Sequence, residues 1–290
     1  MMSRARVIPI TSLFMVLFTL IAYAGCLGPE EEKSQPGISV AVTIPPQAEI
    51  VREIGGGMVD VVVLVPPGSD PHTYEPSPGL VQKAAEADLY LKLGNGLLPM
   101  EDKLAMRLGE MNPGLIVLDT SNGVEYLGQE GKWDPHVWLS LKNAVIMAEN
   151  TRDALILADP LSSDIYQENS GRYIDRIDAL DQRITAKFAA TDPAVILTTH
   201  QAWDYFARDY HLSIISIEHD GKEPTAQDLQ DLIDRARSQG VKVVFAEAQE
   251  SPREAQVVAD EIGATVMIID PLSPDYLASM EHVAMAFAGN

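Results

Sequence analysis

Short apolar runs rich in β-branched residues alternate with helical patterns in two parts of the chain. Strands that are apolar at nearly every position and are separated by helices are typical of parallel sheets covered on both faces. The pattern therefore predicts an α/β protein. The expected strands occupy residues 38–44, 59–65, the end of 80–94 and 114–120 in the first part, and 194–200, 212–219, 241–247 and 264–270 in the second.

The middle of the chain, from about residue 140 to residue 190, carries no strand signal. Its apolar residues are spaced as on one face of a helix, which predicts long amphipathic helices; they include Ile165, Tyr173, Ile177, Leu180 and Ile184.

The order of elements in the first part repeats in the second, with Glu-Pro-Ser before a helix at 75–77 and Glu-Pro-Thr at 223–225. We therefore expect two similar lobes, each a roughly four-stranded parallel sheet flanked by helices. The lobes would comprise residues 38–159 and 191–290, joined by a long helix within 160–190. The cleft between such lobes, at the carboxyl ends of their strands, is where ligands bind.

The N-terminus has the parts of an export signal. Arg4 and Arg6 precede an uncharged apolar run, which ends in small residues and the only cysteine, Cys26. Ala-Gly-Cys at 24–26 resembles a lipobox, so residues 1–26 are expected to be a signal peptide with Cys26 as the lipidated residue. The alternative is an uncleaved membrane anchor, since about 19 apolar residues nearly reach the ~20 that span a bilayer. Either interpretation places the protein on the outer face of the cytoplasmic membrane, with residues 27–37 as a flexible tether.

Composition narrows the class of partner. The chain has 290 residues, 46% of them hydrophobic, and a formal net charge of −21. Nucleic acid is excluded as a partner because phosphate binding needs clustered Lys and Arg. A single cysteine leaves no internal disulfide, so stability must come from core packing.

Candidate metal chemistry lies at the ends of the expected strands. His72 and His136 follow the second and fourth strands of the first lobe, and each ends an Asp-Pro-His tripeptide. His200 ends the first strand of the second lobe, and Asp270 ends its last. If the fold is as expected, all four face one cleft. Three imidazoles and one carboxylate form a tetrahedral set suited to Zn²⁺.

The repeated tripeptide fits a ligand that must be held at a defined angle. Proline restricts the backbone before each histidine, and Asp70 and Asp134 can orient the turns through side-chain to backbone hydrogen bonds. Glu247 follows a strand and has two interpretations. It can hydrogen bond a ligand imidazole and fix its tautomer, or it can mark the start of the helix after Ser251 and Pro252.

The chain resembles the ABC-transporter substrate-binding lipoproteins that collect zinc or manganese, the zinc-uptake/TroA-like group. The resemblance covers residues 38–290 and rests on DPHTYEPSP, DPHVWLS, TTHQAWDYFARDY, FAEAQESPREAQVVADEIGA and IIDPLS, in that order. It implies two lobes linked by a rigid helix, limited hinge motion, delivery of the metal to an ABC permease and no chemical turnover. It also implies that the family's ligands fall on His72, His136, His200 and Asp270.

The resemblance favours zinc, because members with histidine at the third ligand position tend toward zinc and those with glutamate toward manganese. Many zinc-specific members carry a His-rich loop between the first two ligands, whereas residues 75–134 here contain no histidine. Manganese and iron are therefore kept as alternatives for the bound ion. An exported zinc hydrolase is a further alternative, but it needs an open coordination position for water, which Asp270 as fourth ligand would close. A metal-dependent adhesin would differ only in its partners.

Overall fold

The computed structural model describes residues 37–94, 96–191, 195–218 and 224–289. The expected signal peptide, Cys26 and all of the expected tether except Gly37 lie outside these ranges. Among the helices of the described ranges, none combines the length and the apolar character needed to cross a bilayer.

Two four-stranded parallel sheets form the framework, as the sequence pattern predicts. The first sheet has the order β2-β1-β3-β4 and the second the order β10-β9-β7-β8. Taken from its other edge, the second sheet also runs second, first, third, fourth strand, so the two lobes share one topology. The strands of the first sheet are β1 (Ile38–Val42), β2 (Val59–Val63), β3 (Leu89–Lys92) and β4 (Ile116–Asp119), and those of the second are β7 (Ile196–Thr198), β8 (Ile214–Ser216), β9 (Val243–Glu247) and β10 (Thr265–Ile269).

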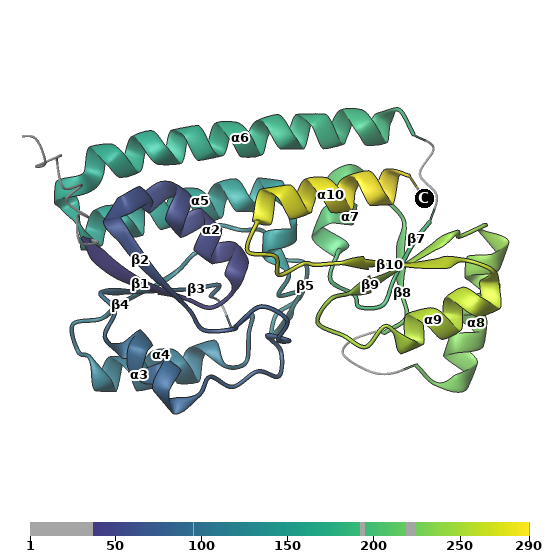
Figure 1. Cartoon of the computed structure of the whole chain (residues 1–290), viewed down its shortest axis with the longest axis horizontal. Coiled ribbons are helices and arrows are strands. Elements are labelled where there is room, and N and C mark those ends of the chain that lie inside the picture. The colour runs from purple at the N-terminus through teal and green to yellow at the C-terminus, as the bar shows by residue number, and fades with distance from the viewer. Residues whose placement is uncertain (1–36, 95, 192–194, 219–223, 290) are drawn as a thin grey trace, which may run out of the picture. The chain divides into compact units, whose positions relative to one another are not determined.

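Helices cover both faces of each sheet (Figure 1). In the first lobe, α2 (Pro45–Gly55) and α5 (Leu141–Ala158) lie on one side, with α3 (Pro78–Ala85) and α4 (Glu101–Met111) on the other. In the second lobe, α7 (Asp204–Tyr210) and α10 (Tyr276–Ala288) lie opposite α8 (Ala226–Ser238) and α9 (Arg253–Ile262). The α3/α4 and α8/α9 sides have separate cores, whereas one continuous apolar core joins the two lobes on the other side.

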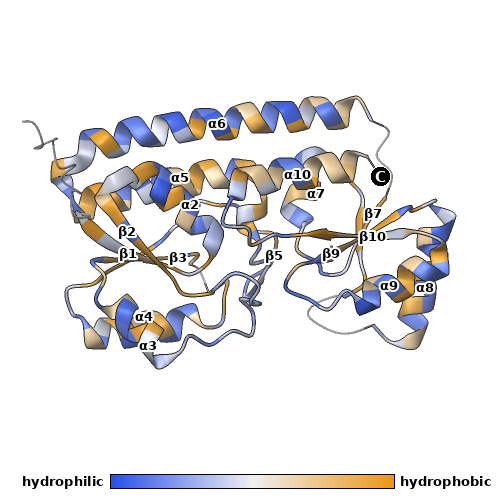
Figure 2. Ribbon diagram, in the orientation of Figure 1, coloured by the Kyte–Doolittle hydropathy of each residue, from blue (hydrophilic) through white to orange (hydrophobic). Residues whose placement is uncertain are grey.

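The long helix α6 (Ser163–Ala189) runs past both sheets and packs on α2, α5 and α10 (Figure 1). Its 27 residues extend over roughly 40 Å at 1.5 Å per residue. Figure 2 shows apolar and polar positions alternating along it. Tyr173, Ile177, Leu180 and Ile184 are buried as expected, but Ile165 is 45% exposed and Tyr166 takes the buried position instead.

The repeated Glu-Pro-Ser/Thr motif has the same structural role in both lobes. Ser77 caps α3 by accepting a hydrogen bond from the amide of Leu80, and Thr225 caps α8 by accepting one from the amide of Asp228. The matched helix starts support the interpretation of the two lobes as a repeat.

A small antiparallel hairpin, which the apolar pattern does not predict, lies between β4 and the loop of residues 134–140, called here the His136 loop. It consists of β5 (Gly128–Gln129) and β6 (Lys132–Trp133). Gly128 has φ +105°, and a Cβ at this position would lie 2.5 Å from the carbonyl oxygen of Lys132, so glycine is required here. The hairpin returns the chain to Asp134, whose amide donates to the carbonyl oxygen of Leu127 at 2.9 Å.

Candidate metal centre

Three imidazole rings from both lobes converge at one point. His72 lies in the loop after β2, His136 follows the β5–β6 hairpin, and His200 follows β7. The Nε2 atom of His136 lies 3.2 Å from Nε2 of His72 and 3.2 Å from Nε2 of His200. Two nitrogens at 2.0–2.1 Å from a tetrahedral zinc ion are separated by about 3.3 Å. The three rings are therefore spaced as ligands of a single small cation.

The two Asp-Pro-His segments form the same turn. Asp70 Oδ1 accepts a hydrogen bond from the amide of His72 at 2.8 Å, and Asp134 Oδ1 accepts one from the amide of His136 at 3.0 Å. The remaining contacts differ. Asp134 Oδ1 also lies 2.7 Å from Nδ1 of the His136 ring, whereas Asp70 Oδ2 accepts from the hydroxyl of Thr73. Both aspartates orient their turns, but only Asp134 contacts its imidazole.

Two of the three rings have a carboxylate at Nδ1. Asp134 contacts His136, and Glu218 Oε2 lies 3.1 Å from Nδ1 of His200, with Glu250 Oε1 at 3.9 Å. A carboxylate at Nδ1 holds the proton there and leaves the Nε2 lone pair for a metal. Within the described residues, the Nδ1 atom of His72 has no such hydrogen bond. His72 is thus the least constrained of the three rings.

The pKa values of the rings differ with their surroundings. Burial, together with the neighbouring imidazole of His136, lowers the pKa of His72 to about 4, so this ring is neutral at physiological pH. Burial alone would lower the pKa of His200, but Glu247, Glu218 and Glu250 outweigh burial and raise it. A cation bound at Nε2 of His200 would therefore compete with a proton more strongly than one bound at His72.

Glu247 has a different partner from the expected imidazole. It is 5% exposed, and its Oε1 accepts a hydrogen bond from the indole of Trp203 at 3.2 Å. Burial raises the pKa of Glu247 to about 8. The carboxylate that accepts a hydrogen bond from Nδ1 of His200 in the described residues is that of Glu218, which sequence reasoning missed. The strand register indicates this contact. β7 and β8 are parallel neighbours with Thr198 opposite Ser216, so the residues two positions further along, His200 and Glu218, also lie opposite each other.

Asp270 follows β10, as expected, but does not join the three imidazoles. Its Oδ1 accepts hydrogen bonds from the side chain of Gln249 at 2.7 Å and from the amide of Leu272 at 2.9 Å. In the described part of the chain, two groups of His and carboxylate side chains have ligand atoms within 4.8 Å of one another, and Asp270 belongs to neither. The groups are His72, His136 and His200, and His200, Glu218 and Glu250.

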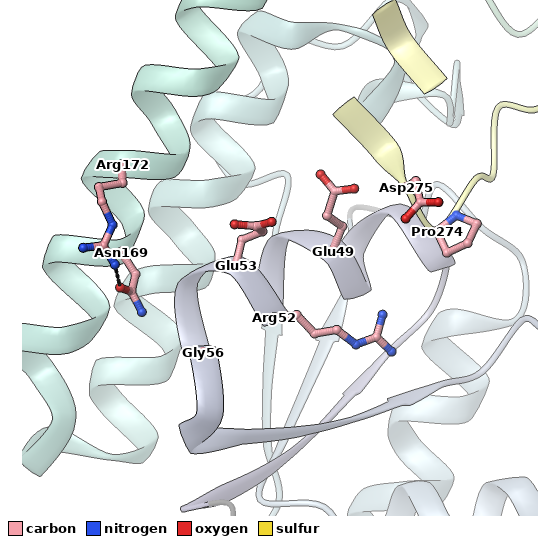
Figure 3. A pocket seen from close by; sticks show the side chains of 8 residues that line it. All are labelled: Glu49, Arg52, Glu53, Gly56, Asn169, Arg172, Pro274 and Asp275. Atoms are coloured by element: carbon pink, nitrogen blue, oxygen red, sulfur yellow. Dashed lines mark hydrogen bonds between the residues drawn. The ribbon is translucent and has the colours of Figure 1, made fainter. Parts of the chain in front are cut away.

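A separate hollow of about 530 Å³ lies where α2 and α6 meet the turn before α10 (Figure 3). Its lining mixes positive and negative side chains and contains no histidine, so it is distinct from the three imidazoles. The lining residues are Glu49, Arg52, Glu53, Gly56, Asn169, Arg172, Pro274 and Asp275.

The chain is similar to known proteins along most of its length. The manganese ABC transporter substrate-binding lipoprotein PsaA of Streptococcus pneumoniae serotype 4 is 30% identical over 266 residues, which cover 87% of this chain and 85% of the relative. Another relative, the metal ABC transporter substrate-binding lipoprotein of Lactococcus lactis subsp. lactis, is 29% identical and covers 87% of this chain and 85% of its own length.

The crystal structure of ZnuA has a TM-score of 0.83 to this chain at 35% identity, covering 87% of this chain and 98% of that one. The family described as "Zinc-uptake complex component A periplasmic" matches residues 40–289. The fold, the three converging imidazoles and this match agree, and the chain belongs to the zinc-uptake complex component A family of periplasmic proteins.

Proposed function

We propose that the protein binds one divalent transition-metal ion outside the cytoplasmic membrane and delivers it to the permease subunit of an ABC transporter. The observation that carries this proposal is the convergence of three Nε2 atoms contributed by both lobes, in which the Nε2 atom of His136 lies 3.2 Å from each of the other two. The family membership and the names of the relatives support delivery to a transporter.

Zinc is the favoured ion. Three imidazole nitrogens suit zinc better than manganese, which prefers carboxylate and carbonyl oxygens. The relatives are named for manganese or for metal in general, while the family description names zinc. Manganese and iron are the alternatives within the same function.

The proposed ligands are His72, His136 and His200 through Nε2, with Asp270 as the fourth. Glu218 is a poorer candidate for the fourth position because it contacts Nδ1 of His200, on the ring edge away from the other imidazoles. Asp270 follows β10 at the edge of the second sheet where the strands end, and a shift away from Gln249 would free its Oδ1 for an ion. A closed four-ligand shell suits a carrier and leaves no position for the water of a hydrolase.

The N-terminal residues would attach the protein to the membrane. We infer that residues 1–26 are a signal peptide, that Cys26 carries lipid, and that residues 27–37 tether the lobes to the outer face of the membrane. The lipoprotein names of the relatives support this arrangement. We also propose that residues 38–159 and 191–290 form the two lobes and that residues 160–190 link them.

The proposed function predicts stoichiometric metal binding. Protein purified without added metal, stripped with a chelator and titrated with zinc in a calorimeter, should bind about one ion per chain. In competition, manganese should displace zinc poorly because the donors are imidazoles. A chain that binds neither zinc, manganese nor iron under these conditions would contradict the proposal.

The two Asp-Pro-His turns supply a matched pair of variants. Asp134→Asn removes the carboxylate at Nδ1 of His136 and should weaken zinc binding roughly 10- to 100-fold, the usual effect of losing such a partner. Asp70→Asn changes the equivalent residue, which does not contact its ring, and should weaken binding much less. Equal affinities of the two variants in a zinc competition assay would show that the Nδ1 contact has no special role.

The fourth ligand can be tested through ligand-linked stability. Asp270→Ala should weaken zinc binding, and a hundredfold loss of affinity would remove about 2.7 kcal/mol of the stabilisation that saturating zinc gives. Asp260→Ala, on the exposed surface of α9, is the control and should leave this stabilisation unchanged. If thermal unfolding with and without zinc is the same for Asp270→Ala as for the control, Asp270 is not a ligand.

A further inference from the structure

We propose that Tyr205, on the second lobe, is a positioning residue for the His136 loop of the first lobe, so that His136 and His200 move as one unit. This inference rests on the proposed metal-binding function and names a determinant of it. The Tyr205 hydroxyl would hold the His136 loop in place, although it is not itself one of the four proposed ligands.

The Tyr205 hydroxyl bridges the base of the β5–β6 hairpin. It accepts a hydrogen bond from the amide of Leu127 at 3.0 Å and donates one to the carbonyl oxygen of Asp134 at 3.0 Å. These two residues are also joined to each other, by the amide of Asp134 and the carbonyl oxygen of Leu127. The ring of Tyr205 is fully buried, so the hydroxyl is held at a fixed place.

A short chain of contacts connects this hydroxyl to the centre. Tyr205 bonds the backbone of Asp134, and the side chain of Asp134 contacts both the amide and the ring of His136. On the other side, Tyr205 lies in the first turn of α7, which begins soon after His200. The carbonyl oxygen of His200 accepts hydrogen bonds from the amide of Ala202 and from the hydroxyl of Thr198. One tyrosine therefore couples the segments that carry two of the three imidazoles.

Further hydrogen bonds attach the rest of this loop to the second lobe. The indole of Trp138 donates to the carbonyl oxygen of Pro271 at 2.8 Å, and the hydroxyl of Tyr276 donates to the carbonyl oxygen of Trp138. The hydroxyl of Ser140 donates to Asp209 on α7. Residues 134–140 belong to the first lobe in sequence and also contact α5, but these hydrogen bonds attach the segment to the second lobe as well.

The His72 loop, residues 66–76, packs Tyr74 against the apolar core, but among the described residues it has no comparable hydrogen bonds to the second lobe. Among the described residues, its hydrogen bonds are internal, mostly to Asp70, apart from the contact between the rings of His72 and His136. The ion would therefore be released by separation of the His72 loop from a fixed pair formed by His136 and His200.

Tyr205→Phe tests this role, because it deletes only the bridging hydroxyl. The variant should bind zinc about three- to tenfold more weakly, with a correspondingly faster release, since the loss of each hydrogen bond loosens the loop before the metal binds. The matched control is Tyr166→Phe, a buried tyrosine whose hydroxyl donates to Asp159 at 2.9 Å. The control should lower the melting temperature of the metal-free protein without changing zinc affinity or the release rate measured with a chelator.

The outcomes separate this inference from the proposed function. If wild type binds zinc and Tyr205→Phe binds and releases it at wild-type rates, the positioning role is wrong and the metal-binding function stands. If wild type binds no metal, both fail.

Hydrogen exchange on the wild-type protein provides a second test that needs no variant. Amides of residues 127–136 should be protected equally without and with zinc, whereas those of 66–76 should gain protection only with zinc. Equal gains in both segments would overturn the inference.

Discussion

The attachment of the His136 loop to the second lobe is the interaction on which the centre depends. A continuous apolar core joins the lobes on the side of α2, α5, α6, α7 and α10. Above this core, the segment from Leu127 to Ser140 leaves the first sheet and is held by α7 and by the residues around Pro271. Because of this attachment, imidazoles that follow strands of two different sheets can approach to 3.2 Å. The parallel topology contributes by ending the strands of each sheet at one edge, which is where such sheets bind ligands.

The strands and the repeat could be predicted from the sequence because each depends on a local pattern. Apolar runs of five to seven residues mark buried strands, and Ser77 and Thr225 mark matched helix starts. His72, His136 and His200 could be named as candidates from the sequence, but their convergence also depends on how the two lobes pack.

The features that sequence reasoning missed depend on contacts between distant segments. Ile165 lies off the buried face of α6, where its neighbour Tyr166 is buried instead, so Ile165 is exposed. The β5–β6 hairpin depends on Gly128 and Gly131, both with positive φ, and has no apolar run. Glu218 contacts His200 because β8 pairs with β7, and Glu247 instead meets Trp203 inside the core. Strand pairing and side-chain packing determine these contacts, and neither can be inferred from the spacing of residues along the sequence.

The chemistry of the centre is that of a carrier. Carboxylates at Nδ1 of His136 and His200 leave the Nε2 atoms of these rings as nitrogen donors. The raised pKa of His200 means that a proton competes with the ion at this ring. In the proposed function, the less constrained His72 would be the ligand that leaves first. Tight but reversible binding suits delivery of an ion to a transporter.

X-ray absorption at the zinc edge tests the central claim most directly, because it counts the imidazoles bound to the ion. For protein loaded with one equivalent of zinc, three imidazole nitrogens are predicted at about 2.0–2.1 Å, with the multiple-scattering pattern of rigid rings, and one or two oxygen neighbours at a similar distance. A first shell made of oxygens, or one with fewer than three imidazoles, would contradict a metal centre built on His72, His136 and His200.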